Sequence, residues 1–127
     1  TDAFVLIEGE AGTGKQVLAR YLHARSVRRE RPFVVVSGAS LTREHAAREL
    51  FGSEQSGELR YGLLEQAQGG TCYIDEVALL DQELQTRLTA ALSTRHLIRV
   101  GGSEPVALDV RVVAGSSRPL AAEVDSG

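Results

Sequence analysis

The chain has little of the chemistry that marks secreted, membrane-spanning or broadly basic proteins. A single cysteine, Cys72, rules out an internal disulfide bond. No apolar run approaches the roughly 18 residues that a membrane helix needs, and the first residues lack the basic start and apolar stretch of a secretory signal. A net charge of -3 excludes a basic surface over the whole molecule. We therefore expect a cytoplasmic protein without a membrane partner.

Lysine is scarce as well, because Lys15 is the only one, against 13 arginines. It stands in "GEAGTGKQ", residues 9–16, between an apolar run and a helical pattern. Glycines of a G-x-x-x-x-G-K loop let backbone N–H groups surround phosphate oxygens, and the lysine adds a positive charge. The pattern predicts a nucleotide-binding P-loop; the alternative is an ordinary glycine-rich turn. Gln16 replaces the usual Mg²⁺-binding Ser or Thr, so Thr13 or water would have to substitute.

The chain has 127 residues, of which 43% are apolar, and this is enough to form one compact domain. Along it, short apolar runs alternate with helical patterns. Strands are expected at 3–8, 31–37, 71–76 and 110–114, and helices at 15–27, 42–52, 63–70 and 82–93. This alternation predicts a parallel α/β sheet with right-handed crossovers.

Local signals add detail to this pattern. Thr42 and Asp81 are expected as helix N-caps, residues 101–105 as a hairpin turn, and 53–62 as a loop or a helix with a broken tip. The buried face of the first helix is expected to consist of Val17, Leu18, Tyr21 and Leu22.

Two acids end the third strand, in "CYIDE". Asp75 and Glu76 would lie at the carboxyl edge of the sheet, where open α/β sheets bind their ligands. This is the Walker B arrangement, in which the aspartate organises Mg²⁺ and the glutamate polarises the attacking water. The alternative is a pair of acids facing solvent.

The order and spacing of "GEAGTGK", "RPFVVVSGASL", "ARELFG", "GLLEQAQGGTCYIDEV", "ELQTRLTAAL", "IRVGG" and "DVRVVAGSSRPL" resemble the AAA+ domain of bacterial sigma-54-dependent transcription activators, the enhancer-binding proteins. The resemblance covers nearly the whole chain. The "ELFG" and "RVGG" pieces are its most family-specific parts. The P-loop of this family ends in G-K-E, so Gln16 departs less from it than from the general motif.

The resemblance implies an α/β P-loop NTPase (AAA+) fold, a three-layer sandwich with a mostly parallel sheet. It implies ATP hydrolysis by a ring oligomer that remodels the sigma-54 RNA polymerase holoenzyme on promoter DNA. Lys15 and Glu76 would be catalytic, and Asp75, with Thr13 or water, would hold Mg²⁺. The residues expected to contact ATP or ADP are Gly9, Glu10, Gly12, Thr13, Gly14, Lys15, Gln16, Asp75 and Ser117.

Departures from the family pattern concern the coupling of this site to its partners. The loop with the G-A-F-T-G-A motif, which contacts sigma-54 in the family, is replaced by "SEQSGELRY", about five residues shorter and without the motif. Its absence argues against productive contact with sigma-54. Ser37 replaces the asparagine that ends the second strand, and Ser116 and Ser117 replace the threonine and asparagine of A-T-N-R. These changes predict weak or uncoupled hydrolysis.

The resemblance also predicts that residues 1–127 are a partial AAA+ core, without the lid subdomain and arginine fingers, whose first strand lies at an exposed edge. Hydrolysis by this chain alone should be weak or absent, and DNA would be bound only by a flanking domain. Two functions stay open. One is the ATP-binding core of a sigma-54-type regulator whose full-length oligomer hydrolyses ATP. The other is a degenerate nucleotide-sensing or assembly module of a sigma-54-independent regulator.

Two further groups of residues are expected to be structural. The arginines of "RSVRRER" are interpreted as a solvated face that complements a helix C-terminus, rather than as a nucleic-acid patch. His23, His45 and His96 lack metal-ligand spacing and are expected in the core or on the surface.

Overall fold

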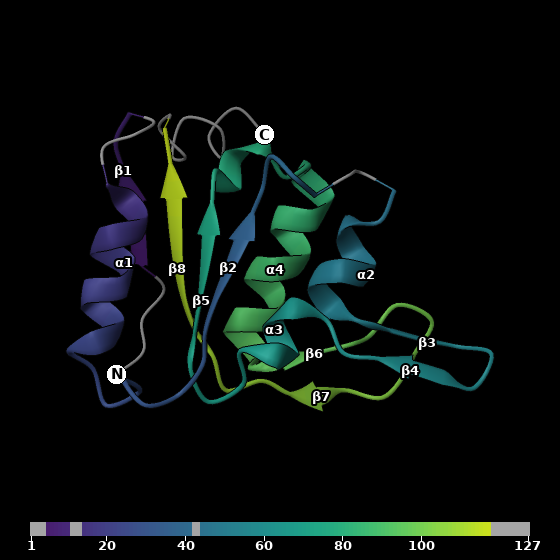
Figure 1. Cartoon of the computed structure of the whole chain (residues 1–127). Helices are drawn as coiled ribbons and strands as arrows, with labels where there is room; N and C mark the ends of the chain where they lie inside the picture. Colours follow the sequence, from purple (N-terminus) through teal and green to yellow (C-terminus); the bar gives the residue numbers. More distant parts are fainter. Residues whose placement is uncertain (1–4, 11–13, 42–43, 118–127) are drawn as a thin grey trace.

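The structure is a computed structural model that describes residues 5–10, 14–41 and 44–117. Its centre is a sheet of four parallel strands in the order β1-β8-β5-β2 (Figure 1). These strands are β1 (Val5–Glu8), β2 (Phe33–Ser37), β5 (Thr71–Asp75) and β8 (Arg111–Ser116). Tyr73 pairs with Val35 on one side and Val113 on the other, and Val113 pairs with Val5. The predicted parallel sheet is confirmed, with β1 at one edge.

Helices cover both faces of this sheet (Figure 1). Helix α1 (Lys15–Ala24) lies on one face, where Ala19 packs with Tyr73 and Val113. The other face carries α2 (Ala46–Phe51), α3 (Leu63–Gln66), the short 3-10 helix η1 (Val77–Leu79) and α4 (Gln82–Thr94). The molecule is therefore the predicted three-layer α/β sandwich.

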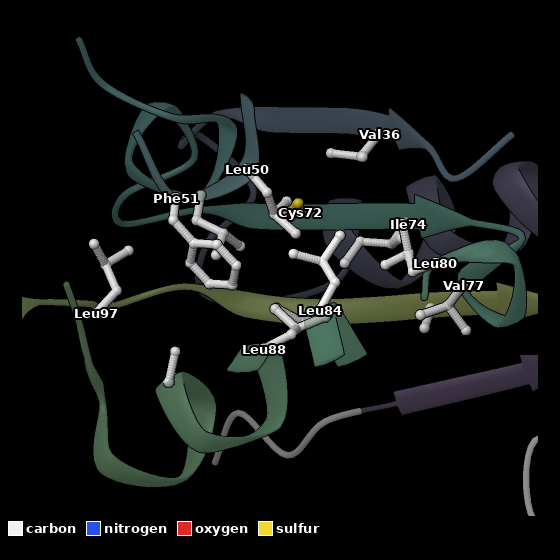
Figure 2. Close-up of a cluster of buried hydrophobic side chains, with 14 of the residues drawn as sticks. Val36, Leu50, Phe51, Cys72, Ile74, Val77, Leu80, Leu84, Leu88 and Leu97 are labelled. Carbon is white, nitrogen blue, oxygen red and sulfur yellow. The ribbon is translucent and has the colours of Figure 1, made fainter. Parts of the chain in front are cut away.

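The larger hydrophobic cluster fills the space beneath these four helical segments (Figure 2). Because strand side chains alternate between faces, Cys72 and Ile74 of β5 point into this cluster while Tyr73 points toward α1. Leu50, Phe51 and Leu84 of the helices meet them there. Full burial of each such side chain contributes roughly 1.5–3 kcal/mol, so this cluster is the main source of stability.

Helix α1 buries a different face from the predicted one. Val17, Leu18 and Tyr21 are exposed, at 72%, 44% and 53% of their surfaces. Leu22 is partly buried, whereas Ala19 and His23 are buried. The imidazole of His23 shares hydrogen bonds with the Thr71 hydroxyl (2.8 Å) and the Arg31 carbonyl (3.0 Å). These internal partners and the small Ala19 set the rotation of the helix, which apolar spacing alone did not reveal.

Residues 53–60 form a hairpin, so the predicted loop or broken helix is wrong. Strand β3 (Ser53–Gln55) pairs antiparallel with β4 (Glu58–Arg60). Ser56 and Gly57 connect them with φ angles of 53° and 76°. Positive φ at both central residues is the mark of a type I′ turn, which matches the twist of paired strands. The predicted hairpin around residues 101–105 is confirmed by β6 (His96–Leu97) and β7 (Val106–Ala107).

The other local predictions have mixed outcomes. Asp81 caps α4 as predicted, because its carboxylate accepts a hydrogen bond from the Leu84 N–H at 2.9 Å. Thr42 lies outside the described residues, and α2 begins after His45, whose side chain makes no capping bond. Arg28 corrects the prediction of a solvated arginine face: it is buried, and its guanidinium donates to the Asp109 carboxylate at 2.6 Å.

Candidate functional site

The carboxyl ends of all four parallel strands meet at one edge of the sheet (Figure 1). We call this the carboxyl edge. Strand β1 ends here at Glu8, ahead of the loop that leads to α1, and β5 and β8 end here in acids and serines. The Gly9 N–H donates to the Ser116 carbonyl (3.0 Å) and the Gly38 N–H to the Asp75 carbonyl (2.7 Å). These backbone hydrogen bonds continue the strand pairing to the ends of the strands. They fix the backbone positions from which the candidate side chains project.

Lys15 occupies the first position of α1, directly after Gly14. Gly14 has φ +85° with open space around its Cβ position, so the backbone conformation rather than crowding requires glycine there. The Lys15 ammonium donates to the carbonyls of Gly9 (2.7 Å) and Glu10 (2.9 Å), which folds the side chain back over its own loop. Among the described residues it forms no ion pair, so a neutral cradle holds the charge.

The other residues predicted for the loop are only partly described by the structure. Gly12 and Thr13 lie outside the described residues. Glu10 and Gln16 are exposed and Gly9 is partly buried. The described part therefore places Gly9, Gly14 and Lys15 together and leaves the side chain of Gln16 facing solvent.

The Asp75 carboxylate is held by a residue of its own strand, Tyr73. The buried Tyr73 hydroxyl donates to its Oδ1 atom at 3.0 Å. Burial raises the pKa of Tyr73, and the hydrogen bond to Asp75 raises it further. The phenol therefore stays protonated as a permanent donor to this carboxylate. Sequence reasoning missed Tyr73, which looked like one more apolar strand residue.

Glu76 leaves β5 in a left-handed conformation, with φ 54° and ψ 53°. For a residue with a side chain this costs roughly 1–2 kcal/mol. Gly38 packs against this backbone so closely that a Cβ there would lie 2.9 Å from the Asp75 carbonyl and would overlap that of Glu76. The Ser117 hydroxyl donates to Glu76 Oε2 at 2.8 Å. The structure thus brings Ser117 to Glu76, two residues that the sequence placed in separate motifs.

The acids at this edge form a sparse donor set. Within the described ranges, no group of three or more His, Cys, Asp or Glu side chains is placed to hold a metal ion. Mg²⁺ in phosphate sites is typically bound by one or two carboxylates together with phosphate oxygens and water. The half-buried Asp75 and Glu76 fit that kind of site.

Other chemically notable groups lie away from this edge. Cys72 is buried, and burial raises its pKa to about 12, so the thiol is unreactive in the folded chain. An apolar pocket of about 380 Å³ lies between α4 and β8, lined by Leu88, Leu92 and Val112 among others, and by none of the described candidate residues. No helix in the described part of the chain is long and apolar enough to span a bilayer.

The fold and the site define a P-loop NTPase type of α/β protein. They combine a parallel sheet, a glycine turn after β1 that opens a helix on a lysine, and two acids at the end of β5, which β8 separates from β1. Comparison with known proteins agrees with this class and narrows it. The chain belongs to the Sigma-54 interaction domain family, whose model matches residues 1–127.

Individual relatives support the same assignment. The transcriptional regulatory protein FlbD of Caulobacter vibrioides is 42% identical over 132 residues, covering 100% of this chain and 29% of FlbD. Structures of NtrX from Brucella abortus in complex with ADP and with ATP are 38% identical, with TM-scores of 0.91 and 0.90, and cover 100% of this chain and 28% and 29% of theirs. The P-loop NTPase domain of a sigma-54 activator from E. coli has a TM-score of 0.64 at 25% identity, covering 99% of this chain and 71% of that one. The chain spans less than a third of the length of FlbD and NtrX.

Proposed function

We propose that this chain is the ATP-binding core of a bacterial transcription regulator of the sigma-54 activator type. The observation that supports the proposal is that Lys15 begins α1 and Asp75 and Glu76 lie at the end of β5, at the same, carboxyl edge of the sheet. A positive charge held by neutral carbonyls and two carboxylates at the end of β5 are the complement of a nucleotide polyphosphate with its cation. The NtrX structures with ADP and ATP support the choice of nucleotide.

The resting geometry indicates how binding would proceed. Lys15 would exchange its bonds to the Gly9 and Glu10 carbonyls for phosphate oxygens, at little cost because both states satisfy its N–H donors. Loop amides and the positive end of the α1 dipole would add to the attraction. Gly12, Thr13, Gly14 and Gln16 complete the proposed loop.

The acids would carry the proposed hydrolysis in the full-length oligomer. Asp75, with Thr13 or water, would hold Mg²⁺, which neutralises phosphate charge when bound. Glu76 would orient and polarise the attacking water. Because the Ser117 hydroxyl already donates to the Glu76 carboxylate, Ser117 would hold that carboxylate until the nucleotide competes for the hydroxyl.

One observation favours the second candidate function, a nucleotide-dependent regulator that does not engage sigma-54. The β3–β4 hairpin closes in two residues, Ser56 and Gly57, at the position where the resemblance implies that the family has its sigma-54 contact loop. The FlbD alignment extends over 132 residues, five more than this chain has. Under this alternative the full-length protein binds ATP and self-associates, while RNA polymerase is contacted elsewhere or not at all, and DNA through a flanking domain.

Nucleotide binding is tested by calorimetric titration with ATP and Mg²⁺. Wild type should bind, and Lys15→Ala should lose at least about tenfold in affinity, since one charge-assisted phosphate contact contributes roughly 1.5–3 kcal/mol. Arg60→Ala is the matched control, because it removes one exposed cation from the remote β3–β4 hairpin. Equal affinities for wild type and Lys15→Ala would refute the proposed site.

The lone lysine allows a direct test of occupancy. An amine-reactive reagent can modify only Lys15 and the chain's N-terminal amine. Bound ATP should protect Lys15 from modification while the N-terminal amine reacts at an unchanged rate, as read by peptide mass spectrometry. Equal labelling of Lys15 with and without ATP would show that nucleotide binds away from the loop.

A further inference from the structure

The α1 face of the sheet carries an arrangement that neither apolar packing nor the proposed phosphate contacts explain. Side chains two residues apart on a strand point to the same face, so Tyr73 and Asp75 both lie on the α1 side of β5. The register pairs Tyr73 with Val113 and Ile74 with Ala114, which places Gly115 beside Asp75 on the same face. A tyrosine, an acid and a glycine thus form a compact group at the carboxyl edge.

Tyr73 is held without freedom to turn away. Its surface is 0% exposed, and its ring packs with Ala19 of α1 and Val113 of β8, flanked by the partly buried Phe33. Its hydroxyl points along the strand and donates to Asp75 Oδ1 at 3.0 Å. A rigid, buried ring therefore delivers one hydrogen-bond donor to one oxygen of this carboxylate.

Gly115 is the counterpart of that hydroxyl. A Cβ added at residue 115 would overlap the Tyr73 hydroxyl and lie 3.2 Å from Cζ and 3.3 Å from Cε1 of the ring. Gly115 is not among the glycines with positive φ, so its backbone conformation does not call for glycine. Glycine inside a strand weakens it and often marks a close approach. Space for the hydroxyl is the one requirement that the structure shows at this position.

We propose that Tyr73 is a positioning residue whose hydroxyl orients the Asp75 carboxylate for cation binding, and that Gly115 is glycine in order to admit this hydroxyl. The proposal rests on the proposed nucleotide function of the carboxyl edge. With Oδ1 occupied by the phenol, Asp75 presents Oδ2 in one preferred direction. Without the phenol, the half-exposed carboxylate can rotate, and a cation must order it at the moment of binding.

Tyr73→Phe isolates the positioning role, because it removes one oxygen and keeps the ring. We expect the Mg²⁺ concentration needed for half-maximal enhancement of ATP binding to rise at least threefold, while ATP affinity in the presence of a chelator stays unchanged. Tyr21→Phe is the matched control, since it removes a hydroxyl from an exposed ring on α1 and should shift neither quantity. An unchanged Mg²⁺ midpoint in Tyr73→Phe would overturn the positioning role.

A double-mutant cycle of melting temperatures tests, without nucleotide, whether the Tyr73 hydroxyl and Gly115 are paired. Gly115→Ala should lower the melting temperature because its methyl group collides with the phenol oxygen. Adding Tyr73→Phe in the same chain should restore part of the loss, because it removes the oxygen, which is the closest contact of the added methyl group, and leaves the two ring carbons. Additive losses in the double variant would refute the pairing.

The two experiments separate the possible failures. If wild type binds no ATP at any Mg²⁺ concentration, the proposed function fails and the positioning role fails with it, whereas the double-mutant cycle still decides the packing claim. If wild type binds ATP with an Mg²⁺ dependence that Tyr73→Phe preserves, the proposed function stands and Tyr73 is a core residue alone.

Discussion

The two ends of the sandwich treat their charged side chains in opposite ways. At the end opposite the carboxyl edge, where the two hairpins lie (Figure 1), Arg99 donates to both carboxylate oxygens of Glu65, at 2.9 and 2.8 Å, and to Glu54 at 3.2 Å. The Arg99 and Glu65 side chains are only 13% and 8% exposed. The hydrogen bonds to Glu65 raise the pKa of Arg99, so its guanidinium stays charged. At the carboxyl edge, the Lys15 ammonium donates to two backbone carbonyls. Among the described residues, Asp75 and Glu76 accept hydrogen bonds from hydroxyl groups and form no ion pair.

The sequence motifs also divide between these two ends of the molecule. "ELFG" and "RVGG", the pieces most specific to the family, meet at the Arg99 end. A Cβ at Gly52 would lie 2.6 Å from the Arg60 carbonyl, and one at Gly101 would lie 2.6 Å from the Glu54 carbonyl. These glycines allow the backbone segments to approach closely beside the Arg99 ion pairs. The family-specific motifs thus stabilise the fold, whereas the glycine loop and the acid pair would, under the proposed function, bind the nucleotide and its cation.

Arg99→Ala should have the largest effect on stability. It leaves the buried Glu65 carboxylate without its cation, and breaking a buried pair in this way costs roughly 3–5 kcal/mol. Since domains of this size are stable by only about 5–15 kcal/mol, the variant should be close to unfolding at 25 °C. Urea denaturation followed by circular dichroism measures the loss.

The matched control for this change is Arg60→Ala on the same side of the molecule. Arg60 pairs with Glu58 at 2.7 Å, but the two side chains are 75% and 64% exposed. Exposed pairs contribute at most about 1 kcal/mol. If the two variants lose equal stability, the Arg99 end is not the structural frame and the comparison of the two ends is wrong.

Much of the fold could be predicted from the sequence because its signals are local. Short apolar runs located the parallel strands, and the acid before a helical pattern located the Asp81 cap. The placement of Lys15, Asp75 and Glu76 at the same edge of the sheet followed from topology, because the carboxyl ends of parallel strands lie together there. The roles assigned to these residues stay predictions.

What could not be predicted depends on contacts between distant segments. The rotation of α1 depends on bonds that His23 makes to Thr71 and Arg31, which its own apolar pattern does not encode. The burial of Arg28 depends on Asp109, a partner far away in the sequence. The match of Tyr73 with Gly115 depends on strand register, so each looked unremarkable in its own segment.

Asp81→Ala should lower the free energy of unfolding by an intermediate amount, and it tests how much the N-cap of α4 stabilises the fold. Its carboxylate caps α4 through the Leu84 N–H, and loss of such a cap costs about 0.5–2 kcal/mol. Asp81→Asn retains a side-chain oxygen acceptor and should keep most of this stability. A calorimetric melting series of the two variants gives the difference. Equal losses in both would show that the negative charge, rather than the capping bond, stabilises the helix.

Glu76→Gln should have the smallest effect on stability and a large effect on function. Glutamine keeps a carbonyl oxygen to accept from Ser117 and the same left-handed backbone, so the free energy of unfolding should change by no more than about 0.5 kcal/mol. Under the proposed function, loss of the carboxylate should lower ATP turnover in the full-length oligomer by roughly 10²–10⁴, with ATP affinity retained. Urea denaturation of this chain and turnover of the full-length protein measure the two quantities. A stability loss comparable with that of Arg99→Ala would mean that Glu76 belongs to the frame, because a side chain reserved for a ligand contributes little to the empty fold.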